Sequence, residues 1–557
     1  MSEKQVRRGS SLLPEAGGAW AVFFMAAACK SQFMSGYRST DFEVHRNWLA
    51  VTNLPFNQWY TESTSEWTLD YPPFFAVFQY VLGFFAKLVD PGMLNIQEEP
   101  YESYKTIYFM RLSVIVTDVF LLLGLCCLLK SLRYAMCPHD YSPIPSAVYA
   151  LVVGSPGLFL LDHMHFQYNG WLTGLLLASL GYITRGVSTL QRLSVSKDAD
   201  AASDESQAHR DVLCGAAAYA FLLCCKHIYL YIAPVFFIFL LRAYCFKQTD
   251  SGSLSFAPTR FISLGFTIVT IMALAFGPIM LSNRFFEMVT RLFPFGRGLT
   301  HAYWAPNVWA LYSFADIVLA KILRKKVGTG AVGGLAQVVE MAALPNIKPK
   351  VTFALTLLVY LPLLAFVWKK PVAPLFAAYC ALGNAIAFTF GWHVHEKAIL
   401  GVTLPLAAVA ASIRDRRLLA NWRWLSAVAN FSILPLLPRP QDQFIAVFFG
   451  MAALLYEGAL ARTICRSWGE NYKRTADSLP LPLKILCMCT WTIFFICALG
   501  WYALPMVLPR LEFLPLMITS VACACLVLPN FFMLFINISR IASELTTHKV
   551  WTKSKDE

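Results

Sequence analysis

Hydrophobic runs recur along the whole chain and are separated by shorter polar segments. A run of about twenty apolar residues has the length of an α-helix that crosses a bilayer, and a helix in lipid satisfies its own backbone hydrogen bonds. The pattern therefore predicts an all-α polytopic membrane protein with about 14 transmembrane helices. The expected spans lie near residues 17–34, 108–129, 146–161, 171–184, 212–225, 228–244, 262–282, 351–368, 373–390, 398–413, 425–437, 443–461, 482–506 and 514–538.

Composition supports the membrane prediction and limits the possible partners. Of the 557 residues, 57% are hydrophobic and 14% are charged, whereas about a quarter of a soluble protein is charged. The formal net charge of +13 is spread over short loops, while a nucleic-acid-binding protein gathers its basic residues on one face. Membrane lipid is therefore an expected partner, and nucleic acid is not.

The basic residues of the short loops predict which side of the membrane each loop faces. Cytosolic loops carry an excess of lysine and arginine, and alternate short loops of this chain are basic, for example at 130–133, 369–370 and 414–417. This alternation predicts that both termini are cytosolic. It places the two long loops, 35–107 and 283–350, on the opposite side.

The C-terminal sequence K-S-K-D-E resembles the dilysine signal that returns membrane proteins to the endoplasmic reticulum. Such a signal must face the cytosol, which agrees with the loop charges and predicts that the two long loops are lumenal. The segment 186–211 is polar and poor in aromatic residues, and its composition predicts a disordered cytosolic linker.

Five stretches that mix polar and aromatic residues interrupt the hydrophobic pattern, and the predicted topology places all five on the non-cytosolic side. Ionisable groups at a membrane boundary are costly and are functional candidates. Any single stretch could instead be an interfacial belt of tryptophan and tyrosine anchors, but five on one side with charges of both signs favour a shared polar cavity. The stretches are T-D-F-E-V-H-R-N-W (40–48), S-E-W-T-L-D-Y-P-P-F-F (65–75), L-D-H-M-H-F-Q-Y-N-G (161–170), R-L-F-P-F-G-R-G-L-T-H-A-Y-W-A-P-N (291–307) and F-G-W-H-V-H-E-K-A-I-L (390–400).

Several common catalytic motifs are missing from these stretches. There is no G-x-S-x-G nucleophile turn, and the H-E-x-x-H zinc motif that begins at His395 fails because position 399 is Ile399. The pairs His393/His395 and His163/His165 are two residues apart, a spacing that does not place both rings on one helical face. We therefore expect no metal and no cofactor.

The remaining inventory consists of carboxylates, histidines, arginines and many aromatic residues. Carboxylates and aromatic rings suit a sugar, and arginine and histidine suit a phosphate. A membrane enzyme that moves a sugar from a lipid phosphate fits this inventory. A polytopic transporter stays open as an alternative, although its internal repeats are not evident in these motifs.

The polar motifs together resemble those of the endoplasmic-reticulum α-1,3-glucosyltransferases that use dolichyl phosphate glucose. The similarity extends from about residue 35 to 400. It implies a C-type glycosyltransferase fold, a dolichyl phosphate glucose donor and a lipid-linked oligosaccharide acceptor. The motifs are T-D-F-E-V-H-R-N-W-L, E-W-T-L-D-Y-P-P-F-F, L-D-H-M-H-F-Q-Y-N-G, K-H-I-Y-L-Y-I-A-P, R-L-F-P-F-G-R-G and W-H-V-H-E-K-A-I-L.

The family has two main branches, which add the first and the second glucose to the dolichyl-pyrophosphate-linked oligosaccharide. The stretches S-T-D-F-E-V-H-R, K-H-I-Y-L-Y and H-A-Y-W-A-P-N are more similar to the second branch. An acceptor that already bears one glucose is therefore expected, and the first-glucose reaction is the alternative. We expect residues 1–400 to form the catalytic membrane module, and 401–557 to form C-terminal helices and a cytosolic tail.

The resemblance also implies the reaction chemistry. A β-linked donor and an α-linked product require inversion, which needs one general base, and the base of the family occupies the position of Asp41. If the segment is helical, Asp41, His45 and Trp48 share a face, while Glu43 can pair with Arg46. His45 and Glu43 are nevertheless kept as substrate-binding candidates.

The other candidate residues are assigned to the two substrates. Asp70, which precedes Tyr-Pro-Pro, could bind the acceptor, serve as the base or cap the following helix. His165 and Gln167 could line the cavity or tie loops together. Cationic residues are the candidates for the donor phosphate, namely Arg297, His393, His395 and Lys397.

Overall fold

The computed structural model divides the chain into two compact units. One unit contains Met1–Leu230 and Phe239–Leu292, and the other contains Tyr231–Ile238 and Phe293–Glu557. The predicted boundary at residue 400 is a functional division and stays a prediction. The structure describes residues 17–136, 144–194, 201–248, 253–293, 296, 298–301, 304–325, 340–437, 442–469, 492 and 514–547.

The first unit is almost entirely helical, and its only described strands form one short hairpin, in which β1 pairs antiparallel with β2. Its α-helices are α2 (Gly18–Ser31), α3 (Thr40–Thr52), α4 (Pro73–Val89), α5 (Tyr104–Met136), α6 (Ser146–Val153), α7 (Pro156–Leu158), α8 (Asn169–Leu193), α9 (Ala201–Leu223), α11 (Pro258–Leu281) and α12 (Phe285–Leu292). Its remaining elements are the 3-10 helices η1 (Phe56–Gln58) and η2 (Pro91–Leu94), the π-helices η3 (Phe159–Phe166) and η5 (Leu241–Cys245), and the strands β1 (Phe246–Gln248) and β2 (Leu254–Phe256).

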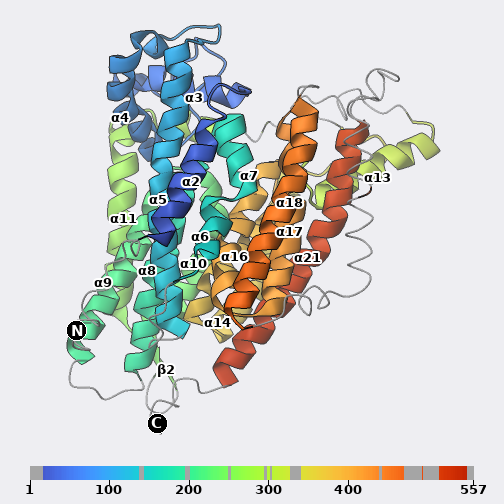
Figure 1. Ribbon diagram of the computed structural model, residues 1–557. Helices are drawn as coiled ribbons and strands as arrows, with labels where there is room; N and C mark the ends of the chain where they lie inside the picture. The colour runs from blue at the N-terminus through green and yellow to red at the C-terminus, as the bar shows by residue number, and fades with distance from the viewer. Residues whose placement is uncertain are drawn as a thin grey trace. The chain divides into compact units, whose positions relative to one another are not determined.

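Close packing of α5 against α8, and of α8 against α9, builds the core of this unit, and the three helices run side by side in Figure 1. Small residues allow the first contact, because a Cβ atom on Gly124 would collide with the carbonyl group of Gly174. Such close approaches at small residues are typical of helices that pack within a membrane. A buried Lys30–Asp118 ion pair of 2.6 Å also joins α2 to α5.

Two predictions about this unit need correction. The predicted long loop 35–107 contains the α-helices α3 and α4, two 3-10 helices and the start of α5. Of these, α4 is an apolar helix of 17 residues that was not among the predicted spans. The predicted linker 186–211 is helical up to Leu193 and again from Ala201. Its last residue, Asp211, pairs with Arg185 and thereby joins α8 to α9.

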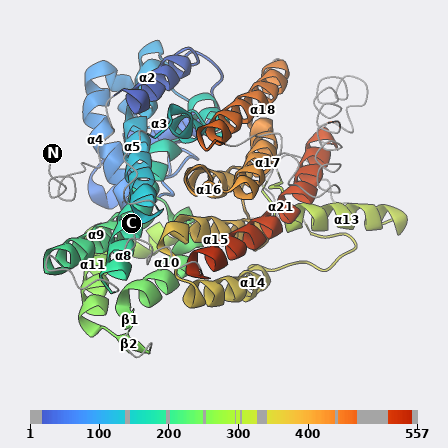
Figure 2. The same ribbon diagram turned by 60° about the horizontal axis from the view of Figure 1, so that its bottom comes forward.

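The second unit contains the remaining helices. Figure 2 shows α14, α15 and α21 beside one another, and α15 is buried along nearly its whole length. Asn421 of α17 donates to the carbonyl of Asn530 in α21, which ties these two helices together. The helices are α13 (Val308–Ile322), α14 (Pro349–Lys369), η7 (Ala373–Leu375), α15 (Phe376–Phe390), η8 (Glu396–Ile399), α16 (Leu400–Ser412), α17 (Arg416–Ile433), η9 (Leu434–Leu436), α18 (Asp442–Ser467) and α21 (Leu514–Thr547). The division between the units cuts the segment formed by η4 (His227–Ile232) and α10 (Ala233–Leu240).

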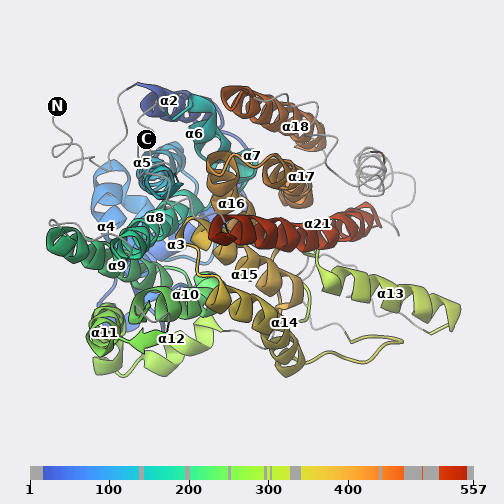
Figure 3. The same cartoon turned by 90° about the horizontal axis from the view of Figure 1, so that it is seen from below.

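Eight helices in the described part of the chain are long and apolar enough to cross a membrane. They coincide with eight predicted spans and confirm a polytopic all-α membrane protein. In α11 and α14, which are labelled in Figure 3, only 17% and 22% of the most apolar stretch of 18 residues is buried inside the protein. The outer faces of these two helices therefore require lipid. The eight are Tyr104–Met136, Ser146–Phe166, His227–Cys245, Pro258–Leu281, Pro349–Lys369, Ala373–Phe390, Phe448–Ser467 and Leu514–Thr547.

The other predicted spans have different outcomes. The span at 17–34 corresponds to the shorter apolar helix α2, and the span at 398–413 to the 13-residue helix α16. The span at 171–184 lies within α8, the one at 212–225 covers the end of α9, and the one at 425–437 overlaps the end of α17. The span at 482–506 lies outside the described residues apart from position 492.

Candidate active site

The predicted helix at the first polar stretch is present as α3, and Asp41 lies in its first turn. An acidic residue at this position is stabilised by the positive end of the helix dipole. The Asp41 carboxylate accepts a hydrogen bond from the amide of Gln167, and the same oxygen lies 3.3 Å from Nε2 of His165. About a quarter of its side chain, 24%, is exposed. The structure therefore brings together three residues predicted from two distant motifs.

The π-helix η3 presents His165 and Gln167 to Asp41. It ends at Phe166, whose φ of 92° is rare for an aromatic residue, and Gln167 follows in an extended conformation. Arg111 holds this end by donating to the carbonyl oxygens of His163 and Met164 at 2.6 and 3.1 Å. π-helical turns are frequent at functional sites, and this one turns two polar side chains toward a carboxylate.

A chain of hydrogen bonds fixes which end of the Gln167 amide faces Asp41. Lysine is only a donor, so Lys226, which lies 2.7 Å from Asn169, must face the amide oxygen of that residue. The Asn169 nitrogen then donates to Asp162 and to the Gln167 oxygen, both at 2.8 Å. The Gln167 nitrogen is left to donate to Asp41. This Lys226–Asn169–Gln167 relay orients the carboxylate.

The charge of Asp70 acts on the Tyr71 phenol, as does the charge of Asp41. Burial, and then the negative charges of Asp70 and Asp41, raise the pKa of the Tyr71 phenol well above its ordinary value. The ammonium of Lys226 lies 5.0 Å from the centre of the Tyr71 ring, a cation–π distance. Asp70 and Asp41 thus act on one aromatic side chain, and Asp70 stays a candidate for acceptor binding.

Glu43 is engaged in a structural pair, as its spacing from Arg46 predicts. The Glu43 carboxylate accepts from Nε of Arg46 at 2.8 Å and from the backbone N–H of Tyr101 at 3.2 Å. Arg46 is fully buried and also donates to the carbonyl oxygens of Met93 and Asn95. The pair ties α3 to the segment after η2, which favours a structural role for Glu43 over contact with substrate.

Asp90 and its hydroxyl partners hold the same segment of the first unit. Its carboxylate accepts from Thr106 at 2.9 Å, from the backbone N–H of Gly92 at 3.1 Å and from Ser103. Burial raises the pKa of Asp90, but these hydrogen bonds outweigh burial and lower it below its ordinary value. The turn after α4 therefore depends on an ionised Asp90.

His45 packs within an aromatic cluster. It is 3% exposed, and its ring lies 4.7 Å from that of Trp48, 5.2 Å from Tyr168 and 5.7 Å from Phe75. Gln79 lies 3.5 Å from its Nδ1 atom. These contacts indicate a packing role for His45, on the face of α3 that helical spacing assigns to Asp41 as well.

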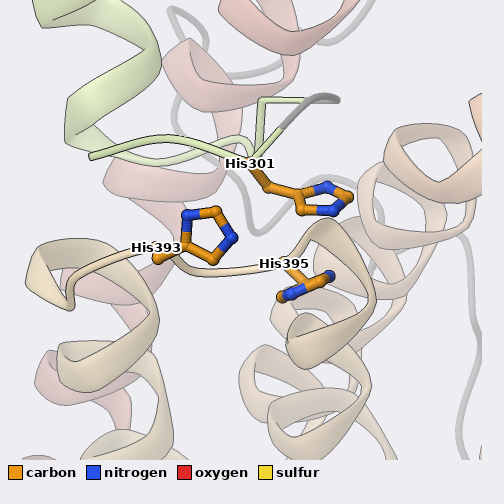
Figure 4. Close-up of side chains that lie close together, drawn as sticks. All are labelled: His301, His393 and His395. Carbon is orange, nitrogen blue, oxygen red and sulfur yellow. The ribbon is translucent and has the colours of Figure 1, made fainter. Parts of the chain in front are cut away.

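In the second unit, the histidines of the last polar stretch meet a third histidine. Figure 4 shows His393 and His395 on one segment and His301 on another, with their rings gathered around one space. One nitrogen from each ring lies within 4.8 Å of the others. A spacing of two residues separates side chains only on a helix. His393 and His395 lie before η8 in a non-helical segment, so this spacing does not prevent them from binding one ligand.

Glu396 and Lys397 follow these histidines at the start of η8. Glu396 is 1% exposed, and its carboxylate lies 3.7 Å from Nδ1 of His301. Burial raises the pKa of Glu396, but His301 and the charge of Lys397 outweigh burial and lower it. Arg297, the remaining phosphate candidate, lies outside the described residues.

The site contains residues that the sequence did not single out as candidates. Asn169 and Asp162 belong to a quoted motif, but only the fold shows that they connect Lys226 to Gln167. Arg111 lies in an apolar span, where a buried cation is itself a signal of function or of structural capping. The sequence signal for these residues was their charge or polarity within apolar surroundings.

Comparisons with known proteins agree with the motif resemblance. A model described as the ALG6, ALG8 glycosyltransferase family matches residues 26–534. A protein of Arabidopsis thaliana named dolichyl pyrophosphate Glc1Man9GlcNAc2 alpha-1,3-glucosyltransferase is 42% identical over 76% of this chain and 78% of that protein. A Mus musculus protein of the same name is 37% identical over 91% of this chain and 94% of its own length. A Drosophila melanogaster protein, whose name adds "probable", is 40% identical over 91% of both chains.

Proposed function

This chain belongs to the ALG6, ALG8 glycosyltransferase family, and we propose that it adds the second glucose to the dolichyl-pyrophosphate-linked oligosaccharide. The acceptor already bears one glucose, and the new linkage is α-1,3. This function rests on sequence similarity. Over 91% of its length, the chain is 37% and 40% identical to two proteins whose names state this reaction. The donor is dolichyl phosphate glucose, as the motif resemblance implies.

In the proposed mechanism, Asp41 is the general base. The acceptor hydroxyl oxygen attacks the anomeric carbon of the donor glucose, and Asp41 takes the hydroxyl proton. The bond between the anomeric carbon and the phosphate oxygen breaks, and dolichyl phosphate leaves as an anion. One displacement inverts the configuration and needs a single base. The partly exposed carboxylate of Asp41 and its fixed orientation by Gln167 support this role.

Cationic, neutral and acidic side chains are proposed to hold the substrates. His393, His395, Lys397 and Arg297 suit the donor phosphate, because hydrogen bonds to a charged phosphate are strong. Asp70, His165 and Gln167 suit the sugar hydroxyl groups, which carboxylates and amides bind through hydrogen bonds.

The topology of the proposed enzyme follows from the loop charges. Both termini are cytosolic, and the chain spans the endoplasmic reticulum membrane about 14 times. The region 35–107, which includes α3 and α4, and the region 283–350 are lumenal. The polar stretches at 161–170 and 390–400 face the same side. Residues 1–400 form the catalytic module of a C-type glycosyltransferase, and 401–557 form the accompanying helices and tail.

The experiment that tests the function uses purified full-length protein in lipid vesicles. Synthetic dolichyl phosphate glucose is offered with two acceptors, one monoglucosylated and one without glucose. Transfer to the monoglucosylated acceptor is expected, and transfer to the other acceptor alone would assign the first-glucose reaction. Asp41→Asn should abolish transfer without loss of folding, whereas Asp204→Asn, at an exposed aspartate of α9, should not affect it. Undiminished transfer by Asp41→Asn would refute the assignment of the base.

A further inference from the structure

The three histidines of the second unit have the arrangement of a metal-binding site. His301, His393 and His395 each offer one nitrogen within 4.8 Å of the other two, and all three are half-buried. We propose that these histidines bind a transition-metal ion of the zinc class. The proposed glucosyl transfer does not require this ion, and the inference rests on the geometry of the three rings. A ring nitrogen that binds the ion cannot also donate a hydrogen bond to the donor phosphate, so the ion and the phosphate would compete for His393 and His395.

Neighbouring groups lie beside two of the rings, where one makes a hydrogen bond and the other an ion-pair contact. Metal-ligating histidines usually bind a carbonyl or a carboxylate through the ring nitrogen that faces away from the metal. Nδ1 of His393 donates to the carbonyl of Gly298 at 2.8 Å, which makes Nε2 the nitrogen with a lone pair. The buried carboxylate of Glu396 lies 3.7 Å from Nδ1 of His301. Both supports involve residues outside the trio.

The backbone that carries the rings is anchored on both sides. The N–H of His393 donates to the carbonyl of Leu299 at 3.0 Å, which joins the two segments that bear the histidines. The indole of Trp309 in α13 donates to the carbonyl of Gly391 at 2.9 Å. His393 has a φ of 51°, a left-handed conformation that is uncommon for a residue other than glycine. The local fold thus stabilises an unusual backbone that keeps this histidine beside the others.

Only a small side-chain movement would complete the coordination. Zinc–nitrogen bonds of about 2.0–2.1 Å in a tetrahedral site place the nitrogens about 3.3 Å apart. The rings would therefore close by roughly 1 to 1.5 Å from their present separation. Rotation about the side-chain bonds of His301 and His395, whose ring centres already lie 4.0 Å apart, supplies a movement of this size.

The donor set determines which ions fit. Neutral imidazoles bind zinc, copper and nickel, whereas magnesium and calcium prefer oxygen ligands. Three protein ligands also leave a fourth coordination position for water or another oxygen ligand. We therefore expect zinc and cobalt(II) to bind, and magnesium not to bind.

Cobalt(II) absorption gives a readout that does not depend on transfer activity. Full-length protein without a histidine tag is freed of metal with a chelator and titrated with cobalt(II). We expect one equivalent of cobalt to produce the visible bands of a tetrahedral site, and zinc to displace it. No bands, or bands that zinc does not remove, would overturn the proposal.

Variants identify the ligands. His395→Ala should abolish the cobalt bands, and Glu396→Gln should weaken cobalt affinity about 10- to 100-fold, as loss of a supporting partner does in other sites. His209→Ala, at a histidine of α9, is the matched control and should bind cobalt like the unaltered protein. Elution as a single species and an unchanged unfolding temperature confirm that each variant is folded. Equal cobalt binding by His395→Ala and the unaltered protein would refute the site. Glucosyl transfer is measured in parallel with chelator present, so that failure of the proposed function and failure of the metal site are separate results.

Discussion

Replacement of Gln167 by glutamate tests whether the relay orients the base. In the structure, the Gln167 nitrogen donates to Asp41, and its oxygen accepts from Asn169 at 2.8 Å. Gln167→Glu keeps the shape and the acceptor. It removes the donor and places a second negative charge against the Asp41 carboxylate.

The size of the effect follows from the lost contact. A hydrogen bond to a charged group contributes about 1.5–3 kcal/mol, which corresponds to a loss of about 10- to 100-fold in kcat/KM at roughly 1.4 kcal/mol per tenfold. Repulsion between two adjacent carboxylates adds to this loss, and such a pair retains a shared proton to higher pH. A base that holds a proton cannot accept one. The acidic limb of the pH–rate profile should therefore move to higher pH, and part of the activity should return as the pH rises.

The assay is glucosyl transfer in lipid vesicles, with kcat/KM measured from pH 5 to pH 9. Gln167→Ala removes the same hydrogen bond without adding charge, so its loss should be smaller than that of Gln167→Glu. Gln58→Glu, at an exposed glutamine, adds the same charge far from the relay in sequence and should change neither rate nor profile. A folded Gln167→Glu protein with an unaltered rate and pH profile would refute the orienting role.

Three further perturbations probe the supports of the site. Glu43→Gln leaves the buried Arg46 without its counter-charge, so the unfolding free energy should fall by about 3–5 kcal/mol; an unchanged unfolding temperature would contradict the structural role. Burial raises the pKa of Asp90, but hydrogen bonds from neighbouring hydroxyl groups outweigh burial and lower it. The ionised carboxylate therefore stabilises the fold at pH values above its ordinary pKa of about 4. This contribution is lost as the pH falls through the lowered pKa. Asp90→Asn should therefore be less stable than the unaltered protein at pH 7 and show a smaller further loss on acidification, measured by thermal unfolding at several pH values. Lys226→Met removes the donor to Asn169 and should lower kcat/KM about tenfold, with partial recovery in Lys226→Arg; equal rates for all three proteins would exclude Lys226 from the relay.

The local features of the site could be predicted from the sequence, because they depend on neighbours along the chain. Helical spacing predicted that Glu43 pairs with Arg46, and the structure confirms it. Long apolar runs predicted the eight membrane-length helices of the described chain. By contrast, helical spacing gave the wrong reason for separating His393 from His395, because their segment is not helical.

The tertiary features could not be predicted in this way. Asp41 and Gln167 are separated by 126 positions, and the contact depends on how η3 ends. The positive φ of Phe166 is imposed by packing and by the bonds of Arg111 to the last carbonyls of the π-helix. No periodicity in the sequence specifies such a bend, since an aromatic residue does not favour it intrinsically.

The choice between the two acids of α3 now rests on geometry as well as on family resemblance. A general base must reach a proton on the substrate. The two oxygens of Glu43 accept from Arg46 and from the backbone of Tyr101, and the residue is 4% exposed. The side chain of Asp41 is 24% exposed, and the relay through Gln167 directs a donor to one of its oxygens. One helical turn thus carries two carboxylates with different surroundings, so that Glu43 anchors the helix and Asp41 is accessible for proton transfer.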